Sequence, residues 1–118
     1  MILSLTLPRV GEQMREATVH RLIARSGEPL RPGSGILELR VDLGAAKAQD
    51  CPPVFHFRLV ATERAHLRAL DVAVGDELAV GAPLGVATTT PDEAADGAGA
   101  RALRTTSVAI QVDPLAAG

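Results

Sequence analysis

Two segments with the same turn chemistry, at residues 27–36 and 75–84, constrain the fold of this chain more than any other feature. Each places a glycine and an acid before an apolar residue, and then a second glycine before an apolar stretch. Glycine permits positive φ, and an acidic side chain can hydrogen-bond to the backbone of a turn. In every matched pair the two residues are separated by the same number of positions, here called the repeat offset. The pairs are Gly27 and Gly75, Glu28 and Asp76, Leu30 and Leu78, Gly33 and Gly81, and Ile36 and Leu84. The repeat therefore predicts two similar halves, with function to be sought between them.

Short apolar stretches separated by glycine and proline predict an all-β fold, a sandwich or flattened barrel. Apolar residues make up 47% of the 118 residues, yet Phe55 and Phe57 are the only aromatic ones, so the core should be aliphatic. A small closed fold of this kind is expected to leave no cleft for a substrate. The strands are expected at residues 2–7, 17–24, 36–41, 54–60, 67–74, 84–88 and 105–112.

Charge and cysteine content exclude several classes of function. The net charge is −2 and no basic stripe is present, so neither nucleic acid nor a membrane is an expected partner. Cys51 is the only cysteine, which rules out an internal disulfide. No signal peptide and no apolar run of membrane-spanning length are visible, so a cytoplasmic protein is expected.

Three segments together resemble the lipoyl/biotinyl carrier domain family, and most closely the lipoyl domain of 2-oxo acid dehydrogenase acyltransferase subunits. The segments are LPRVGEQMREATV at 7–19, GEPLRPGSGILEL at 27–39 and GDELAVGAPL at 75–84. The resemblance covers roughly residues 3–42 and 66–88. It implies a flattened barrel of two four-stranded sheets related by a pseudo-twofold axis.

The resemblance also implies a tight hairpin between the halves that presents a lysine in an Asp-Lys-Ala motif, to which lipoate is attached. Here Asp42 is in register with that aspartate, but the lysine slot holds Leu43, which cannot be acylated. The two halves lie farther apart than in the family, so residues 44–53 look inserted and the hairpin is enlarged over 43–53.

The function expected from this departure is a free-standing, non-catalytic binding or scaffolding module without a cofactor. Its partners would be subunits of a 2-oxo acid dehydrogenase-type complex, of which it could be a component, or a lipoate ligase. The alternative is a carrier with lipoate, or less readily biotin, on Lys47. This residue is the only lysine, lies in the enlarged hairpin and is followed by Ala48.

The remaining residues that could carry chemistry are better explained by ordinary structural roles. His20, His56 and His66 are expected on separate strands without metal-ligand spacing, so no metal site is predicted. Cys51 lacks a Cys-x-x-Cys partner and is taken as a plain loop cysteine. Four glutamates stand at positions that resemble family turn and recognition sites, and by themselves they indicate turns and a solvated face: Glu12, Glu16, Glu28 and Glu38.

The predicted organisation is a barrel over 1–90, a flexible loop over 91–100, an additional strand within 101–113 and a tail over 114–118. The extra strand has no counterpart in the family module. It could pack on its own chain or exchange with a second copy, because an exposed strand edge has to be covered. Both a monomer and a homodimer through this strand remain open.

Overall fold

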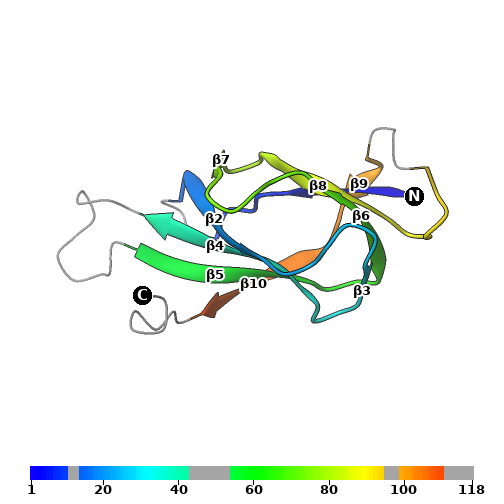
Figure 1. Cartoon of the computed structure of the whole chain (residues 1–118), viewed down its shortest axis with the longest axis horizontal. Coiled ribbons are helices and arrows are strands. Elements are labelled where there is room, and N and C mark those ends of the chain that lie inside the picture. Colours follow the sequence, from blue (N-terminus) through cyan, green and yellow to red (C-terminus); the bar gives the residue numbers. More distant parts are fainter. Residues whose placement is uncertain (11–13, 43–53, 95–98, 111–118) are drawn as a thin grey trace.

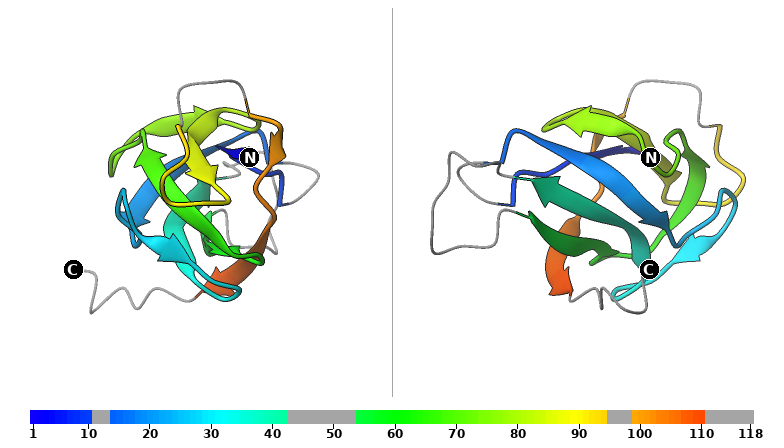
Figure 2. Two further views of the ribbon diagram at one scale, coloured as in Figure 1. Left: turned by 90° about the vertical axis from the view of Figure 1, so that its right-hand side faces the viewer. Right: turned by 60° about the vertical axis from the view of Figure 1, so that its left-hand side comes forward.

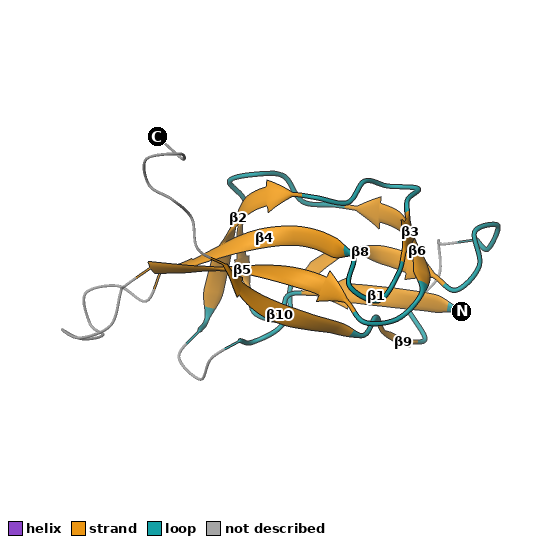
Figure 3. Cartoon of the chain, turned by 90° about the horizontal axis from the view of Figure 1, so that it is seen from below, coloured by secondary structure: helices purple, strands orange, loops and turns teal. Residues whose placement is uncertain are grey.

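The computed structural model describes residues 1–10, 14–42, 54–94 and 99–110, and within these ranges it contains strands and no helix. Ten strands form two sheets of five (Figures 1 and 3). The order in the first sheet is β3 (Pro29–Leu30), β6 (Ala65–Leu70), β8 (Pro83–Thr88), β1 (Ile2–Thr6), β9 (Arg101–Ala102). The order in the second is β10 (Thr105–Ile110), β5 (Val54–Ala61), β4 (Gly35–Asp42), β2 (Glu16–Leu22), β7 (Glu77–Ala79). The predicted all-β class is confirmed.

The two sheets have the same internal order. The counterparts of β3, β6, β8 and β1 in the other half are β7, β2, β4 and β5. The first sheet runs β3-β6-β8-β1, and the second sheet, read from its β7 edge, runs β7-β2-β4-β5. The family resemblance implies four strands in each sheet, with one additional C-terminal strand. A fifth strand is present because the C-terminal segment adds β9 beside β1 and β10 beside β5.

At each of the repeated turns the chain passes from one sheet to the other. Gly27, Gly33, Gly75 and Gly81 have φ values of 93°, 97°, 96° and 90°. The Gly27 turn joins β2 to β3 and the Gly33 turn joins β3 to β4, each time changing sheet. The Gly75 and Gly81 turns do the same for β6, β7 and β8. The positive φ inferred from the sequence repeat is therefore confirmed at all four positions.

Hydrogen bonds in the two halves match at the same repeat offset. The amide of Gly27 donates to the carbonyl of Leu67, and the amide of Gly75 donates to the carbonyl of Val19. The strand irregularities also correspond, because β2 is bulged at His20 and β6 at Arg68. The resemblance between the halves thus extends from turn sequence to individual backbone bonds.

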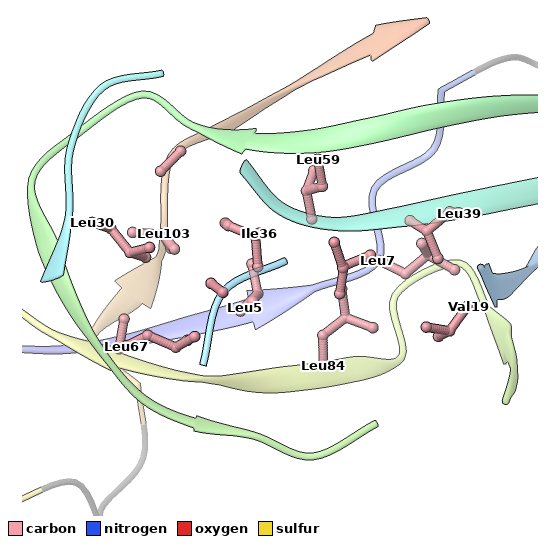
Figure 4. Packing of buried hydrophobic residues seen from close by; sticks show 14 of the residues in the cluster. Leu5, Leu7, Val19, Leu30, Ile36, Leu39, Leu59, Leu67, Leu84 and Leu103 are labelled. Carbon is pink, nitrogen blue, oxygen red and sulfur yellow. The ribbon is translucent and has the colours of Figure 1, made fainter. Parts of the chain in front are cut away.

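The predicted aliphatic core is confirmed between the two sheets. Figure 4 shows leucine and isoleucine side chains of one sheet pointing toward those of the other. Phe57 is 1% exposed and is the one aromatic side chain among the fully buried ones of the described chain, whereas Phe55 packs at the edge of the cluster. Burying such side chains contributes roughly 1.5–3 kcal/mol each. This interior is filled by its own side chains, and the two sheets face each other across it in Figure 2.

The C-terminal segment joins the sheets along one side of the sandwich. β9 runs parallel to β1, and β10 pairs antiparallel with β5 of the same chain. Leu103, between β9 and β10, is 5% exposed and belongs to the core cluster. Sequence patterning signalled β10 but not β9, because β9 is too short to carry a pattern.

Glu63 fastens this segment at the turn between β5 and β6. Its carboxylate accepts hydrogen bonds from both terminal nitrogens of Arg101, at 2.6 and 2.7 Å, and from the amide of Arg104 at 2.8 Å. The Arg101 guanidinium is the main cause that lowers the pKa of Glu63 to about 2. The C-terminal strands are therefore held by an ionised carboxylate as well as by strand pairing.

Strand limits differ from the prediction in β6. Residues 67–74 were expected as the strand, but β6 begins at Ala65 and ends at Leu70. Beyond it the carboxylate of Asp76 accepts from the amide of Ala73 at 2.9 Å, which closes the turn earlier than the apolar pattern suggests. The predicted loop at 91–100 is described only in part, since residues 95–98 lie outside the described ranges.

Substituting Gly75 by alanine should destabilise the fold by roughly 1–2 kcal/mol, because an L-residue is strained at positive φ. A Cβ at Gly75 would meet no atom within 4 Å, so the cost comes from backbone conformation alone. Urea unfolding followed by circular dichroism measures it. Gly75→Asn is the matched control and should lose less, since asparagine tolerates positive φ better. An alanine variant as stable as the wild type would show that the turn can relax.

Glu63→Gln should remove a defined part of the acid sensitivity of folding. The folded pKa of about 2 lies below the reference value of 4.5. The stabilisation from this carboxylate is therefore complete above pH 4.5 and is lost as the pH falls from 4.5 toward 2. Thermal unfolding midpoints across this window should fall less steeply in the variant.

Glu77→Gln is the control for Glu63→Gln, because Glu77 is an exposed carboxylate on the short strand β7. If both variants show the same pH profile, the bonds to Arg101 and Arg104 do not stabilise the C-terminal segment.

Candidate functional site

A row of polar residues crosses the outer face of the second sheet near the ends of β4 and β5. His56 on β5 pairs with Arg40 on β4, and Arg40 pairs with Thr18 on β2. Directly paired residues on antiparallel strands point to the same side of a sheet. Since the neighbouring Leu39 and Val41 are buried in the core, this row faces outward.

His20 joins the row through a bulge in β2. Register in the β2–β4 pair shifts between Val19 and Arg21, so His20 is the extra residue on the bulged strand. Its ring lies 4.8 Å from that of His56, measured between centroids, in an edge-to-face arrangement with an interplanar angle of 66°. Two imidazoles from strands that are not neighbours thus meet across β4.

An ion pair with a buried carboxylate stands next to these rings. The side chain of Glu38 is 5% exposed although it lies on the outer face, because Arg58 covers it. Arg58 donates to the same carboxylate oxygen from Nε at 3.0 Å and from a terminal nitrogen at 2.8 Å. The expectation of a solvated glutamate is therefore wrong at this position: Glu38 is desolvated and paired.

Arg40 is exposed and, unlike Arg58, makes no ion pair with any residue in the described ranges. It lines the same groove as the two imidazoles. Because the charges of Glu38 and Arg58 offset each other, Arg40 gives the row a net positive charge even when both histidines are neutral.

The row forms one wall of an open groove of about 470 Å³. The turn at Val74 and Gly75 forms the opposite rim, and the side chain of Val74 is among the most exposed large apolar groups of the described chain. This rim is fixed, because the amide of Gly75 donates to the carbonyl of Val19 at 2.8 Å. The groove is lined by Thr18, Val19, His20, Arg40, Val54, His56, Val74 and Gly75. The sequence had predicted no cleft in so small a fold.

The pKa of His56 lies below its ordinary value of 6.5. Partial burial is the largest cause, followed by the positive fields of His20 and Arg40, and Glu38 opposes these effects in part. His56 is therefore mostly neutral at pH 7 and can both donate and accept a hydrogen bond.

The third histidine is separate from this pair. His66 lies on β6 in the first sheet, beside a second open groove that includes Arg31, Arg64 and Thr89. Among the residues in the described ranges, no three His, Cys, Asp or Glu side chains are grouped so that they could hold a metal ion. Two of the three histidines do come together, which the sequence did not predict.

The position that the resemblance assigns to the attachment lysine directly follows the last residue of β4. Asp42 is exposed, is the last residue of β4 and pairs with Val54. Leu43 and Lys47 lie outside the described residues, as does Cys51. The predictions for these residues therefore stay predictions. The histidine row lies just before Asp42 along β4, at the base of the enlarged hairpin.

Comparison with protein-family descriptions, with curated proteins and with solved structures found no match for this chain. Over the described ranges, no helix has the length and apolar character needed to cross a membrane.

Acidification should weaken the fold through His56. The unfolded state binds the proton more readily than the native state does, because the native pKa is lowered. Stability should therefore be complete above pH 6.5 and decline as the pH falls below 6.5 and through the native pKa. Urea midpoints measured from pH 7.5 to 5 should decline less in His56→Gln than in the wild type.

The matched control for His56→Gln is His66→Gln, which removes an imidazole from the other sheet. If His66→Gln flattens the pH profile as much as His56→Gln does, the contacts of His56 with His20 and Arg40 are not the source of the acid sensitivity.

Proposed function

We propose that this chain is a non-catalytic protein-binding module built on a lipoyl/biotinyl-type barrel that lacks the usual attachment lysine. Its partner is a subunit of a 2-oxo acid dehydrogenase-type complex or an enzyme that handles lipoate. The observation that supports the proposal best is the matching backbone of the two halves. Equivalent strand orders, glycine turns and bulges recur at one repeat offset, as a barrel with pseudo-twofold symmetry requires.

The β4–β5 hairpin is the element through which such a module would meet its partner. Its strands pair from Gly35 opposite Val60 to Asp42 opposite Val54, so the ladder continues to the edge of the enlarged segment. In the resembling family this end presents the modified residue to other enzymes. A partner that reads this end by shape needs a rigid support, and the long β4–β5 ladder provides one.

Binding fits the described residues better than catalysis does. The space between the sheets is filled with aliphatic side chains, and the grooves described above, both lined by described residues, are open. Enzymes hold reacting groups in fixed geometry and exclude water from them, which an open groove on a sheet face does poorly.

The second candidate function is a carrier lipoylated on Lys47. One observation favours it: the only lysine in 118 residues lies at position 47, within the segment that replaces the modification hairpin. The attachment chemistry needs an accessible primary amine, which no other side chain provides.

Intact mass after co-expression with a lipoate ligase and supplied lipoate separates the two functions. The binding module should emerge unmodified. An added mass of lipoyl size that maps to Lys47 and disappears in Lys47→Arg would overturn the first proposal and establish the carrier.

Co-sedimentation of the purified chain with a 2-oxo acid dehydrogenase complex from the same host tests the partner. Leu43→Asp should weaken binding by at least roughly tenfold, because it replaces an apolar side chain by a charge in the segment through which the module is proposed to meet its partner. Leu22→Asp is the control, since it adds the same charge at an exposed residue that pairs with Leu37, near the opposite end of β4. Equal binding by both variants and the wild type, or no binding by the wild type, would count against this partner.

A further inference from the structure

We propose that His20, Arg40 and His56 form a binding site for an oxyanion, a phosphate or a carboxylate group, on the outer face of the second sheet. The proposal does not depend on the lipoyl-type function, because it follows from the geometry of the groove alone.

Three nitrogen-bearing side chains from three adjacent strands converge on this groove. Arg40 on β4 lies between His56 on β5 and the bulged His20 on β2, and all three line the same groove. The imidazole rings lie 4.8 Å apart between centroids, so a ligand of a few atoms can reach both. The hydroxyl of Thr18 lines the same groove and adds a further possible donor.

Among the described residues, no acid forms an ion pair with Arg40. Glu38 faces His56 from β4, but its carboxylate is already paired with Arg58 on β5. Asp76, beside the Gly75 rim, accepts from the amide of Ala73. The groove therefore keeps an exposed guanidinium next to two titratable rings.

An anion fits this set of groups better than a metal ion does. Zinc sites take three or four protein ligands, and here two imidazoles are joined by a cationic guanidinium that repels a metal ion. A guanidinium matches the geometry of phosphate and carboxylate with paired donors. In the described part of the chain, no third His, Cys, Asp or Glu completes a metal site beside the two rings.

The equivalent positions in the first sheet carry different side chains, and one of them is buried. At the repeat offset Arg40 and Thr18 correspond to Thr88 and His66, and Thr88 is 0% exposed. Arg68, the counterpart of His20, donates to the hydroxyl of Thr88 and to the carbonyl of Glu93. Arg68 and Thr88 thus fasten the chain in one half, whereas in the other half their counterparts His20 and Arg40 line a groove.

Binding should take up a proton and strengthen as the pH falls. The groups that face His56 are His20 from β2, Arg40 and Glu38 from β4, and Arg58 beside it on β5. Burial and the two cationic neighbours disfavour the imidazolium in the free protein. A bound oxyanion offsets that repulsion, so the charged form becomes favourable in the complex.

Histidine NMR titration of the full chain tests the site, with inorganic phosphate and acetate added in turn against chloride at equal ionic strength. Phosphate, acetate or both should raise the titration midpoint of His56 and move the signals of His20. Arg40→Gln should weaken the binding of the anion that responds by roughly tenfold, since a charge-assisted hydrogen bond is lost. The responding anion identifies the ligand class, phosphate or carboxylate.

His66 is an internal control in the same spectra, because it lies beside Arg31 and Arg64 in the other groove. Three outcomes overturn the proposal: no response of His56 to either anion, an equal response of His66, or an unchanged response in Arg40→Gln. A separate titration with zinc ion adds a fourth. Saturable shifts of His20 and His56 with zinc, without any anion response, would assign the groove to a metal instead.

Discussion

The fold depends on a backbone constraint at four turns, each of which must carry the chain from one sheet to the other over a short stretch of sequence. A glycine with φ between 90° and 97° stands at each of these crossings. Because only glycine adopts this conformation without strain, the crossings fix both the sheet order and the side of each strand that faces inward. The outer-face row that forms the groove is one consequence, since Leu39 and Val41 point into the core and Arg40 points out.

Much of the fold was predictable because its determinants are local in sequence. Glycine–acid turns and the apolar alternation in β5 each act within a short window, and the structure has the corresponding turns and strands. The short strand β9 has no such window. Its position beside β1 depends on Leu103 entering the core and on Glu63 binding Arg101, which are contacts between residues far apart in the chain.

The groove could not be predicted from the sequence for a related reason. His20 and His56 lie on β2 and β5, which are separated in the sheet by β4, so their contact requires the strand order to be known. It also requires the bulge in β2, and a bulge at His20 leaves no mark in composition or alternation. The sequence repeat offered one signal. Arg68 is the counterpart of His20, just as Gly75 is the counterpart of Gly27, so a known bulge at one of these two residues would have implied a bulge at the other.

Equal backbones with unequal side chains show how a duplicated architecture can separate stability from recognition. In the first sheet the bulge residue Arg68 and the buried Thr88 hold the segment after β8 against the sheet, and Glu93 also pairs with the amino terminus. These contacts engage Arg68 and Thr88 within the fold. In the second sheet the corresponding positions hold His20 and the exposed Arg40, which lie at an open groove at the base of the β4–β5 hairpin. Satisfied polar groups gain little from a ligand, whereas exposed cationic groups on a rigid sheet can exchange water for an anion at small entropic cost. Recognition is therefore expected at the groove of the second sheet, where Arg40 has no ion-pair partner among the described residues.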